Sequence, residues 1–339
     1  MDTITDFGRT HVAQLTGTAG LVSYALLRKK LTPDGIAAGI FVAFVHMLHP
    51  WQGIFWLLIV FFLLGTIVTR AGHAAKAQIT QSSGGGGGGE GARTSAQVFA
   101  NSGTACVLIL LHLWVLSSSP FISSTLPVAP GPHLPLLSKL LPIGTIAQYA
   151  AVAADTFSSE LGILSQSKPF LITAPWKRVP AGTNGGVTLD GLLYGGLGSV
   201  LLVQTAALTL KFLPPHIVVS RQTAALLTLA GFLGTVIDSL LGAVVQATVT
   251  DKKTGRVVEG HGGTRVKAGS ERVQMGWDLL TNNGVNFAMA ALTSMIAMGA
   301  AWAVEANLGT VRYISQNSLP SSQPSSINAL TNRGISKND

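Results

Sequence analysis

The chain has 339 residues, of which 47% are hydrophobic and 11% are charged, and its formal net charge is +8. Soluble domains carry about 25% charged residues, so this composition, with a mean hydropathy of +0.46, excludes a soluble globular protein and indicates a membrane protein. The single cysteine, Cys106, lies in an apolar run and excludes an intramolecular disulfide.

Apolar runs of about the length that spans a bilayer as a helix recur along the chain. The second and third runs are separated only by His49, Pro50 and Trp51. Because Pro50 cannot donate a helical hydrogen bond, we predict a tight hairpin there rather than one broken helix. We therefore predict an all-α polytopic membrane protein with about eight transmembrane helices, or seven if the weakly apolar first run does not span. The predicted spans are residues 12–27, 34–49, 51–69, 97–117, 143–164, 190–210, 224–249 and 283–304.

Basic residues collect on one side of these spans. Fifteen of the 22 lysines and arginines fall within residues 28–30, 70–93, 168–178 and 252–272. Short loops rich in Lys and Arg stay in the cytoplasm, so we predict that this side is cytoplasmic and that both termini lie on the opposite side. Positive charge on one membrane face favours anionic headgroups or a phosphorylated ligand as the partner, rather than nucleic acid.

The predicted organisation is one integral membrane domain, residues 1–312, followed by a disordered C-terminal tail, residues 313–339. The glycine-rich run within 78–92 is expected to be a flexible cytosolic linker without a phosphate-binding role. The acidic N-terminus indicates neither a secretory signal nor a transit peptide, so the first span is expected to act as a signal anchor. The expected location is the endoplasmic reticulum or another endomembrane.

Two acidic residues stand in separate predicted spans, Asp155 in the fifth and Asp238 in the seventh. No lysine or arginine within the spans neutralises them, so they require another cation, and Mg²⁺ prefers such oxygen ligands. We therefore predict a metal site at Asp155 and Asp238. Glu160 lies about 140° round the helix from Asp155, so either the helix is interrupted or Glu160 serves a neighbouring contact. Interhelical hydrogen bonding is the alternative role for the polar residues Ser158, Gln246 and Asn283.

The loop after the fifth span contains residues suited to phosphate binding. Two basic residues precede the sequence "GTNGG", and a new helix follows. Glycines let backbone N–H groups turn towards an anion, and the N-terminus of a helix adds a positive dipole end. The predicted phosphate or nucleotide ligands are Lys177, Arg178, Gly182, Thr183, Asn184, Gly185 and Gly186.

Six blocks of the chain resemble, in order, the multi-pass family that contains the plant chloroplast phytyl-phosphate kinase and human transmembrane protein 19. The longest, "KRVPAGTNGGVTLDG", is hard to produce by chance, whereas Phe157 and Ser102 depart mildly from the family pattern. The blocks are "RTSAQVFANSG" (93–103), "ADTFSSELGILS" (154–165), "KPFLIT" (168–173), "KRVPAGTNGGVTLDG" (177–191), "DSLLGAVVQ" (238–246) and "LLTNNGVNFAMA" (279–290).

This resemblance implies a Mg²⁺-dependent kinase that transfers a phosphoryl group from a nucleoside triphosphate to an isoprenyl monophosphate in the bilayer. A distant similarity to polyprenol kinases favours CTP as the donor. The catalytic residues that the resemblance implies are Asp155, Ser159, Glu160 and Asp238. The residues expected to orient the substrate or the metal are Asn282, Asn283, Asn286, Gln246 and Asn101.

Three alternatives stay open at this point. The chain is also consistent with a transporter of an anionic lipid or ion that uses its intramembrane acids, or with a polyprenol kinase that acts on the free alcohol. A non-catalytic protein that keeps only the family fold is the third. The chain length of the prenyl group, the nucleotide and the oligomeric state do not follow from the sequence.

Overall fold

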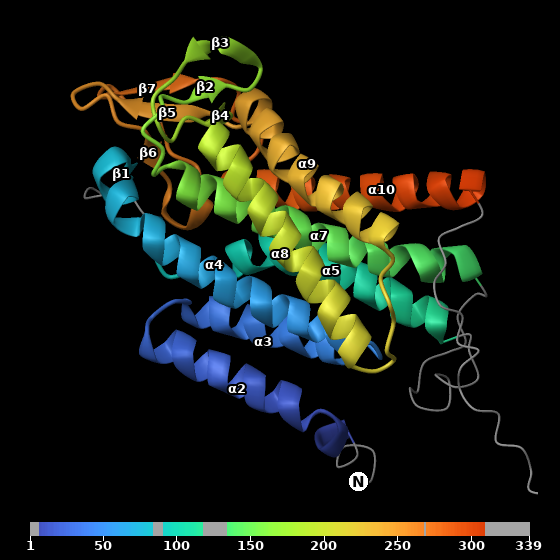
Figure 1. Ribbon diagram of the computed structural model, residues 1–339. Helices are drawn as coiled ribbons and strands as arrows, with labels where there is room; N and C mark the ends of the chain where they lie inside the picture. The colour runs from blue at the N-terminus through green and yellow to red at the C-terminus, as the bar shows by residue number, and fades with distance from the viewer. Residues whose placement is uncertain (1–6, 84–90, 118–133, 268, 309–339) are drawn as a thin grey trace, which may run out of the picture.

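The computed structural model describes residues 7–83, 91–117, 134–267 and 269–308. Eight long helices in this part of the chain form a bundle (Figure 1). Six are long and apolar enough to cross a membrane, whereas α2 and α3 are apolar but shorter. The helices match the eight predicted runs in order, so the predicted all-α polytopic membrane fold is confirmed. They are α2 (Val12–Leu27), α3 (Pro33–Met47), α4 (Gln52–Ile79), α5 (Ser95–Leu116), α7 (Pro135–Gly162), α8 (Leu189–Phe212), α9 (Arg221–Val245) and α10 (Asn282–Leu308).

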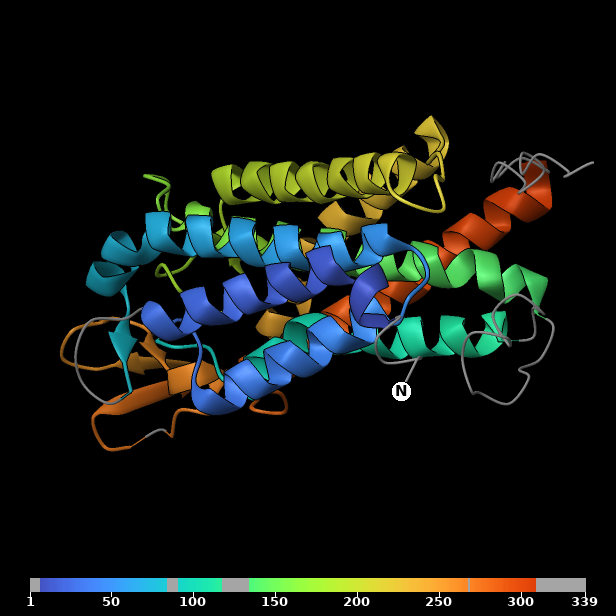
Figure 2. The same ribbon diagram turned by 90° about the horizontal axis from the view of Figure 1, so that it is seen from below.

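The predicted hairpin at His49-Pro50 is present. Helix α3 ends at Met47 and α4 begins at Gln52, and the two helices run back along each other (Figure 2). Successive helices reverse direction, so the fifteen basic residues, in loops or in the last turns of α4, all lie towards one end of the bundle. This arrangement is the one that the distribution of Lys and Arg predicts for a cytoplasmic face.

Several helices begin at side chains that satisfy the first free backbone N–H groups. Thr32, Thr188 and Ser220 each accept a hydrogen bond from the backbone N–H three residues later, at the starts of α3, α8 and α9. Thr94 and Gln97 form a reciprocal capping box at the start of α5. Three of these four starts lie at the basic end of the bundle, where they help to place the helix ends around the site.

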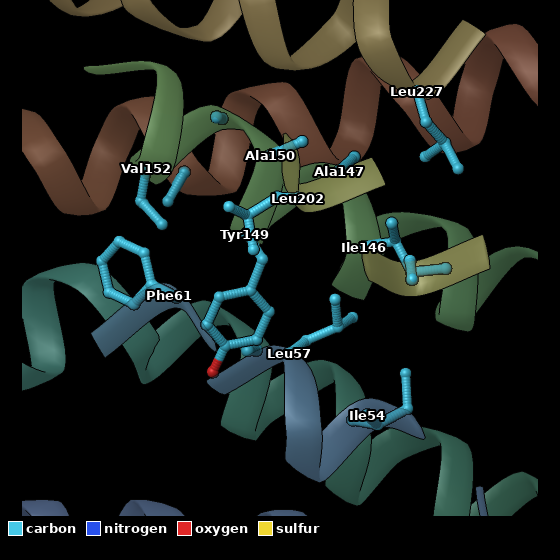
Figure 3. Close-up of a cluster of buried hydrophobic side chains, with 14 of the residues drawn as sticks. Ile54, Leu57, Phe61, Ile146, Ala147, Tyr149, Ala150, Val152, Leu202 and Leu227 are labelled. Atoms are coloured by element: carbon cyan, nitrogen blue, oxygen red, sulfur yellow. The ribbon is translucent and has the colours of Figure 1, made fainter. Parts of the chain in front are cut away.

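Helix α7 forms the centre of the bundle, and α4, α5, α8, α9 and α10 pack around it. Its small residues allow close approach: a Cβ atom added at Gly198 would lie 2.7 Å from the Ala153 carbonyl oxygen, and one at Gly234 would lie 2.5 Å from Ala151 Cβ. Close packing of small residues is the usual means of joining helices in a bilayer, where apolar burial provides little drive. Figure 3 shows Tyr149 of α7 among the larger apolar side chains of this core.

Short strands form a cap at the basic end, which the sequence did not predict. We use the term cap for β1 with residues 164–188 and 246–281. The strands make three small sheets: a parallel pair β1–β6, a sheet of order β3-β2-β4 and an antiparallel pair β5–β7. The bounds are β1 (Gln81–Ser82), β2 (Phe170–Leu171), β3 (Ala174–Arg178), β4 (Gly186–Val187), β5 (Thr248–Asp251), β6 (Val258–Glu259), the 3-10 turn η1 (His261–Gly263) and β7 (Arg272–Met275).

Residues 84–90 of the predicted linker 78–92 and the whole predicted tail 313–339 lie outside the described residues. At the start of the linker, α4 continues through Ile79, and Gln81–Ser82 pair with Val258–Glu259. The long helix α4 therefore reaches past the apolar span and joins the cap, which brings Lys76 to the site.

Candidate functional site

A polar cavity of about 260 Å³ opens where the helix ends meet the cap. Helices α4, α5, α7, α9 and α10 contribute to it, together with the turn 182–186. Fourteen of the sixteen residues predicted for the site lie in its wall: Asp155, Ser159, Glu160, Asp238, Gly182, Thr183, Asn184, Gly185, Gly186, Asn282, Asn283, Asn286, Gln246 and Asn101. Residues that are up to 185 positions apart in the chain therefore meet in one space.

Asp155 and Asp238 face this cavity from the parallel helices α7 and α9. The helices touch at Ala151 and Gly234, and each aspartate follows its contact residue by four positions, one helical turn towards the cap. Their negative charges repel one another. Within the described residues, Asp238 Oδ2 is buried and has no hydrogen-bond partner. Such a buried carboxyl group is stable in its charged form only when a cation or a hydrogen-bond donor faces it.

Glu160 lines the same cavity although α7 continues without interruption to Gly162. Its Oε1 atom accepts a hydrogen bond from Lys76 Nζ of α4 at 3.3 Å, and its residue is 4% exposed. Of the two arrangements that the sequence left open for Glu160, the neighbouring contact is correct. Ser159 lies at the exposed edge of the cavity, where its hydroxyl donates to the Thr156 carbonyl at 3.4 Å.

The cations of the cavity are Lys76 and Arg93, which the sequence analysis did not assign to the site. Arg93 donates to Thr69 Oγ1 at 3.2 Å. The guanidinium lies beside Gly65 between α4 and α7, because a Cβ at this glycine would be in ordinary van der Waals contact, at 3.8 Å, with both terminal nitrogens of Arg93. The only sequence signals were the position of Arg93 just before a capping box and the extension of α4 beyond its apolar span.

Lys177 and Arg178 do not line the cavity, and their part in phosphate binding stays a prediction. Both lie on β3, and their side chains are exposed. Arg178 donates to the Lys168 carbonyl at 2.9 Å and stacks over the Phe170 ring. Strand β3 pairs with β2, and the turn 182–186 that follows β3 lines the cavity.

The turn 182–186 approaches α9 closely. Gly182 and Gly185 have φ values of +86° and +74°, and a Cβ at Gly185 would lie 2.4 Å from Ala243 Cβ. Only glycine fits both this conformation and this contact. Asn184 anchors the turn to the start of β5, because its backbone N–H donates to Thr248 Oγ1 at 3.0 Å and its side-chain amide to the Ala247 carbonyl at 2.8 Å. Asn184 therefore shapes the turn.

The remaining amides take up different positions around the cavity. Asn282 begins α10 and Asn286 follows one turn later, and both line the cavity. Asn283 donates to the Gly262 carbonyl of η1 at 2.8 Å and so joins α10 to the cap. Asn101 donates to the Gln97 carbonyl at 3.0 Å, and Gln246 is the residue that ends α9. Asn282 and Asn286 are thus the amides best placed to face a ligand.

The donor set fits a hard divalent cation. In the described part of the chain, no three His, Cys, Asp or Glu side chains come together as a protein-only metal site. Mg²⁺ is commonly held by one or two carboxylates together with substrate phosphates. Asp155, Asp238 with its unsatisfied Oδ2, and the two amides of α10 provide such a partial set. Asp155 and Asp238 therefore remain the predicted ligands of a Mg²⁺ ion.

A second space, the cap cavity, adjoins the first. Its volume is about 160 Å³, and its wall includes β5, β6 and η1. The residues common to both cavities are Lys76, Gly182, Asn184, Gln246, Glu259 and Asn282. The two spaces thus meet at the ammonium group of Lys76 on α4 and at Asn282, the first residue of α10.

The apolar helices and the charged cavity at one membrane face define an integral membrane protein with a buried polar site. The chain belongs to the family described as integral membrane protein DUF92, whose model matches residues 16–294. The family expected from the resemblance is thereby confirmed.

Named relatives extend this assignment. The chain is 34% identical over 279 residues to Protein PGR of Arabidopsis thaliana, covering 79% of this chain and 88% of that protein. It is 26% identical to Protein VTE6, chloroplastic, of the same plant, over 62% of this chain and 56% of the relative. It is 30% identical to an uncharacterized membrane protein of Methanocaldococcus jannaschii, covering 66% of this chain and 79% of the relative. No solved structure matches the chain.

These relatives give no support to the expected endoplasmic reticulum location. One is described as chloroplastic, and others come from Methanocaldococcus and Synechocystis, which have no endoplasmic reticulum. The multi-pass membrane location is shown by the family and by the apolar helices.

Proposed function

We propose that this protein is a membrane-embedded kinase that converts an isoprenyl monophosphate to its diphosphate. A phosphate oxygen of the lipid forms a new bond to the terminal phosphorus of a nucleoside triphosphate, with CTP as the favoured donor. The bond from that phosphorus to the bridging oxygen breaks, and the nucleoside diphosphate leaves with the electron pair. The resemblance to the phytyl-phosphate kinase family supports this choice of acceptor.

The observation that carries the proposal is the convergence of acids, cations and the amides of Asn282 and Asn286 in one cavity at the end of the apolar helices. Asp155 and Asp238 meet there with Lys76, Arg93 and the glycine turn 182–186. Phosphoryl transfer depends mainly on positioning and on neutralising phosphate charge, and these are the groups that such chemistry needs. An apolar core alone would not retain two repelling acids, since their burial is costly.

Each group has a proposed part in the reaction. Arg93 pairs with the phosphate of the lipid, because its guanidinium lies at the membrane side of the cavity next to Thr69. Lys76, held by Glu160, faces both cavities and neutralises the phosphates of the donor. Mg²⁺, held by Asp155 and Asp238, would supply charge neutralisation for the transferred group. No general base is needed, because a phosphomonoester oxygen is already anionic.

The cap cavity is the proposed seat of the nucleoside. It lies outside the apolar helices and meets the polar cavity at Lys76 and Asn282, so a triphosphate lying across this junction would bring its terminal group to Asp155 and Asp238. The lipid phosphate would then reach the same point from the bilayer side. Two substrates of opposite solubility therefore meet without either leaving its own phase.

The test is phosphoryl transfer by the purified full-length protein in detergent with Mg²⁺. Labelled CTP and, separately, labelled ATP are offered with phytyl, geranylgeranyl and farnesyl monophosphates and with the corresponding free alcohols. We expect isoprenyl diphosphate from the monophosphates and its loss in Asp155→Asn. The control is Glu271→Gln, which removes an exposed carboxylate of the cap that pairs with Lys253 at 2.7 Å and should leave transfer unchanged.

Absence of product with every donor and acceptor, from protein that elutes as one folded species, would contradict the kinase. Product from the free alcohols alone would identify a polyprenol kinase instead. Flux of a lipid phosphate or an ion across reconstituted vesicles, without transfer, would indicate the transporter.

A further inference from the structure

An apolar groove adjoins the polar cavity inside the bundle. Four helices, α2, α3, α4 and α5, form its walls. Its wall exposes little polar surface and consists mainly of aliphatic and aromatic side chains: Leu21, Val22, Leu31, Ile36, Val42, Ala43, Leu58, Ile59, Phe61, Phe62 and Val98. The groove begins beside the α2–α3 loop and extends along α3 from Ile36 to Ala43, a length of about 10 Å at the rise of an α-helix.

The groove and the polar cavity share three residues, Arg93, Gln97 and Asn101. Gln97 and Asn101 lie one turn apart on α5, and the Arg93 guanidinium lies beside them against Gly65. Apolar surface therefore changes to charged surface at one guanidinium. A molecule with a phosphate joined to a hydrocarbon chain has this same division of chemistry.

We infer that the apolar groove between α2, α3, α4 and α5 holds the isoprenoid chain of the lipid phosphate, while Arg93 binds its phosphate. The inference rests on the proposed function, for which it names the binding place of the acceptor. A single groove receives one hydrocarbon chain, as an isoprenyl phosphate carries, whereas a diacyl phospholipid carries two. The aromatic rings of Phe61 and Phe62 on α4 contact the chain near the bilayer interior.

Gly39 offers a direct way to test this groove. It lies in the wall on α3, and a Cβ atom added there meets no atom within 4 Å. Gly39→Phe would therefore fill the groove without a clash at the backbone. Gly299 on α10 is the matched control, because a Cβ there also meets no atom within 4 Å and this glycine does not line the groove.

The experiment compares acceptors of increasing chain length with wild type, Gly39→Phe and Gly299→Phe. We expect Gly39→Phe to lower kcat/KM for geranylgeranyl phosphate by about tenfold or more, because several buried methylene and methyl groups lose their contacts. The value for the five-carbon dimethylallyl phosphate should change by no more than about twofold, since its chain ends within the roughly 4.5 Å that separate Ile36 from Gly39 along α3. Equal losses for both acceptors, or no loss for either, would overturn the inference.

A binding measurement separates this inference from the proposed reaction. Farnesyl phosphate with a photoreactive group at the end of its chain is crosslinked to the wild type, and the labelled peptides are identified by mass spectrometry. Labels in α3 and α4 that disappear in Gly39→Phe and not in Gly299→Phe support the groove even if no transfer is found. Labels on the outer face of α8, or complete displacement of the probe by phosphatidic acid, would overturn the groove even if transfer is found.

Discussion

Lys76 Nζ lies 3.3 Å from Glu160 Oε1, and this ion pair joins α4 to α7 at the edge of the polar cavity. The two side chains are only 14% and 5% exposed. Because removal of one member leaves the other charge buried, we expect Lys76→Met to lower the free energy of unfolding by about 3 kcal/mol and to abolish transfer. Thermal unfolding in detergent and the transfer assay measure the two effects.

The double variant Lys76→Met with Glu160→Gln separates stability from function. Without either charge, most of the lost stability should return, since no ion stays buried alone. Phosphoryl transfer should stay absent, because the ammonium that faces both cavities is missing. Recovery of transfer together with stability would show that the pair has a structural role only.

Asp238 is the second target. We expect Asp238→Asn to raise the thermal midpoint in the absence of divalent ions, because it removes a buried charge that is repelled by Asp155. Mg²⁺ should raise the midpoint of the wild type and leave that of the variant unchanged, since only the wild type holds the ion between two carboxylates. Thermal scans with and without MgCl₂ measure both shifts. An equal response to Mg²⁺ in both proteins would remove Asp238 from the metal site.

Arg93 and Lys177 distinguish the cavity from the basic surface of the cap. Arg93→Ala should lower kcat/KM for the lipid phosphate by about a hundredfold, as expected for the loss of a half-buried charged contact to phosphate. Lys177→Ala should change it by no more than about twofold, because this residue is exposed on β3 and outside the cavity. The reverse order of effects would return the phosphate site to the loop, as the sequence first indicated.

Gly185 tests the close approach of the turn to α9. Gly185→Ala should destabilise the protein by about 3 kcal/mol, since a positive φ costs an alanine about 1 kcal/mol and its Cβ meets Ala243 at 2.4 Å. Gly255→Ala is the matched control, because Gly255 has a φ of +68° and open space around the added carbon. It should cost only the roughly 1 kcal/mol that comes from the positive φ. Thermal unfolding compares the two, and equal costs would mean that α9 moves aside freely.

Most of the helical fold was predictable because the hydropathy of each segment depends only on the residues of that segment. Each apolar run must form its own backbone hydrogen bonds in a bilayer, so length and composition suffice to locate it. The turn at His49-Pro50 followed from the chemistry of proline in the same way. The cap was not predictable, because its strands are two to five residues long and pair between distant segments, as β1 does with β6.

The site was predictable where the residue type alone is informative. Asp155 and Asp238 are costly in a membrane wherever they point, so their presence in apolar runs indicated function before any contact was known. Lys76 and Arg93 gave no such signal, because basic residues are ordinary at the cytoplasmic ends of spans. Lys177 and Arg178 were predicted for the site because they precede the glycine turn, and the structure places them on the exposed strand β3.

By itself, the sequence determined that this is a polytopic helical membrane protein with acids in its apolar runs and most of its basic residues at one end of the spans. Only the tertiary structure decided which cations accompany those acids, that Glu160 pairs with Lys76, and that an apolar groove meets the polar cavity at Arg93. The physical reason is that hydropathy and charge are properties of single segments. A cavity and its partners depend instead on how closely separate helices approach, which small residues such as Gly198 and Gly234 set through contacts that no local pattern records.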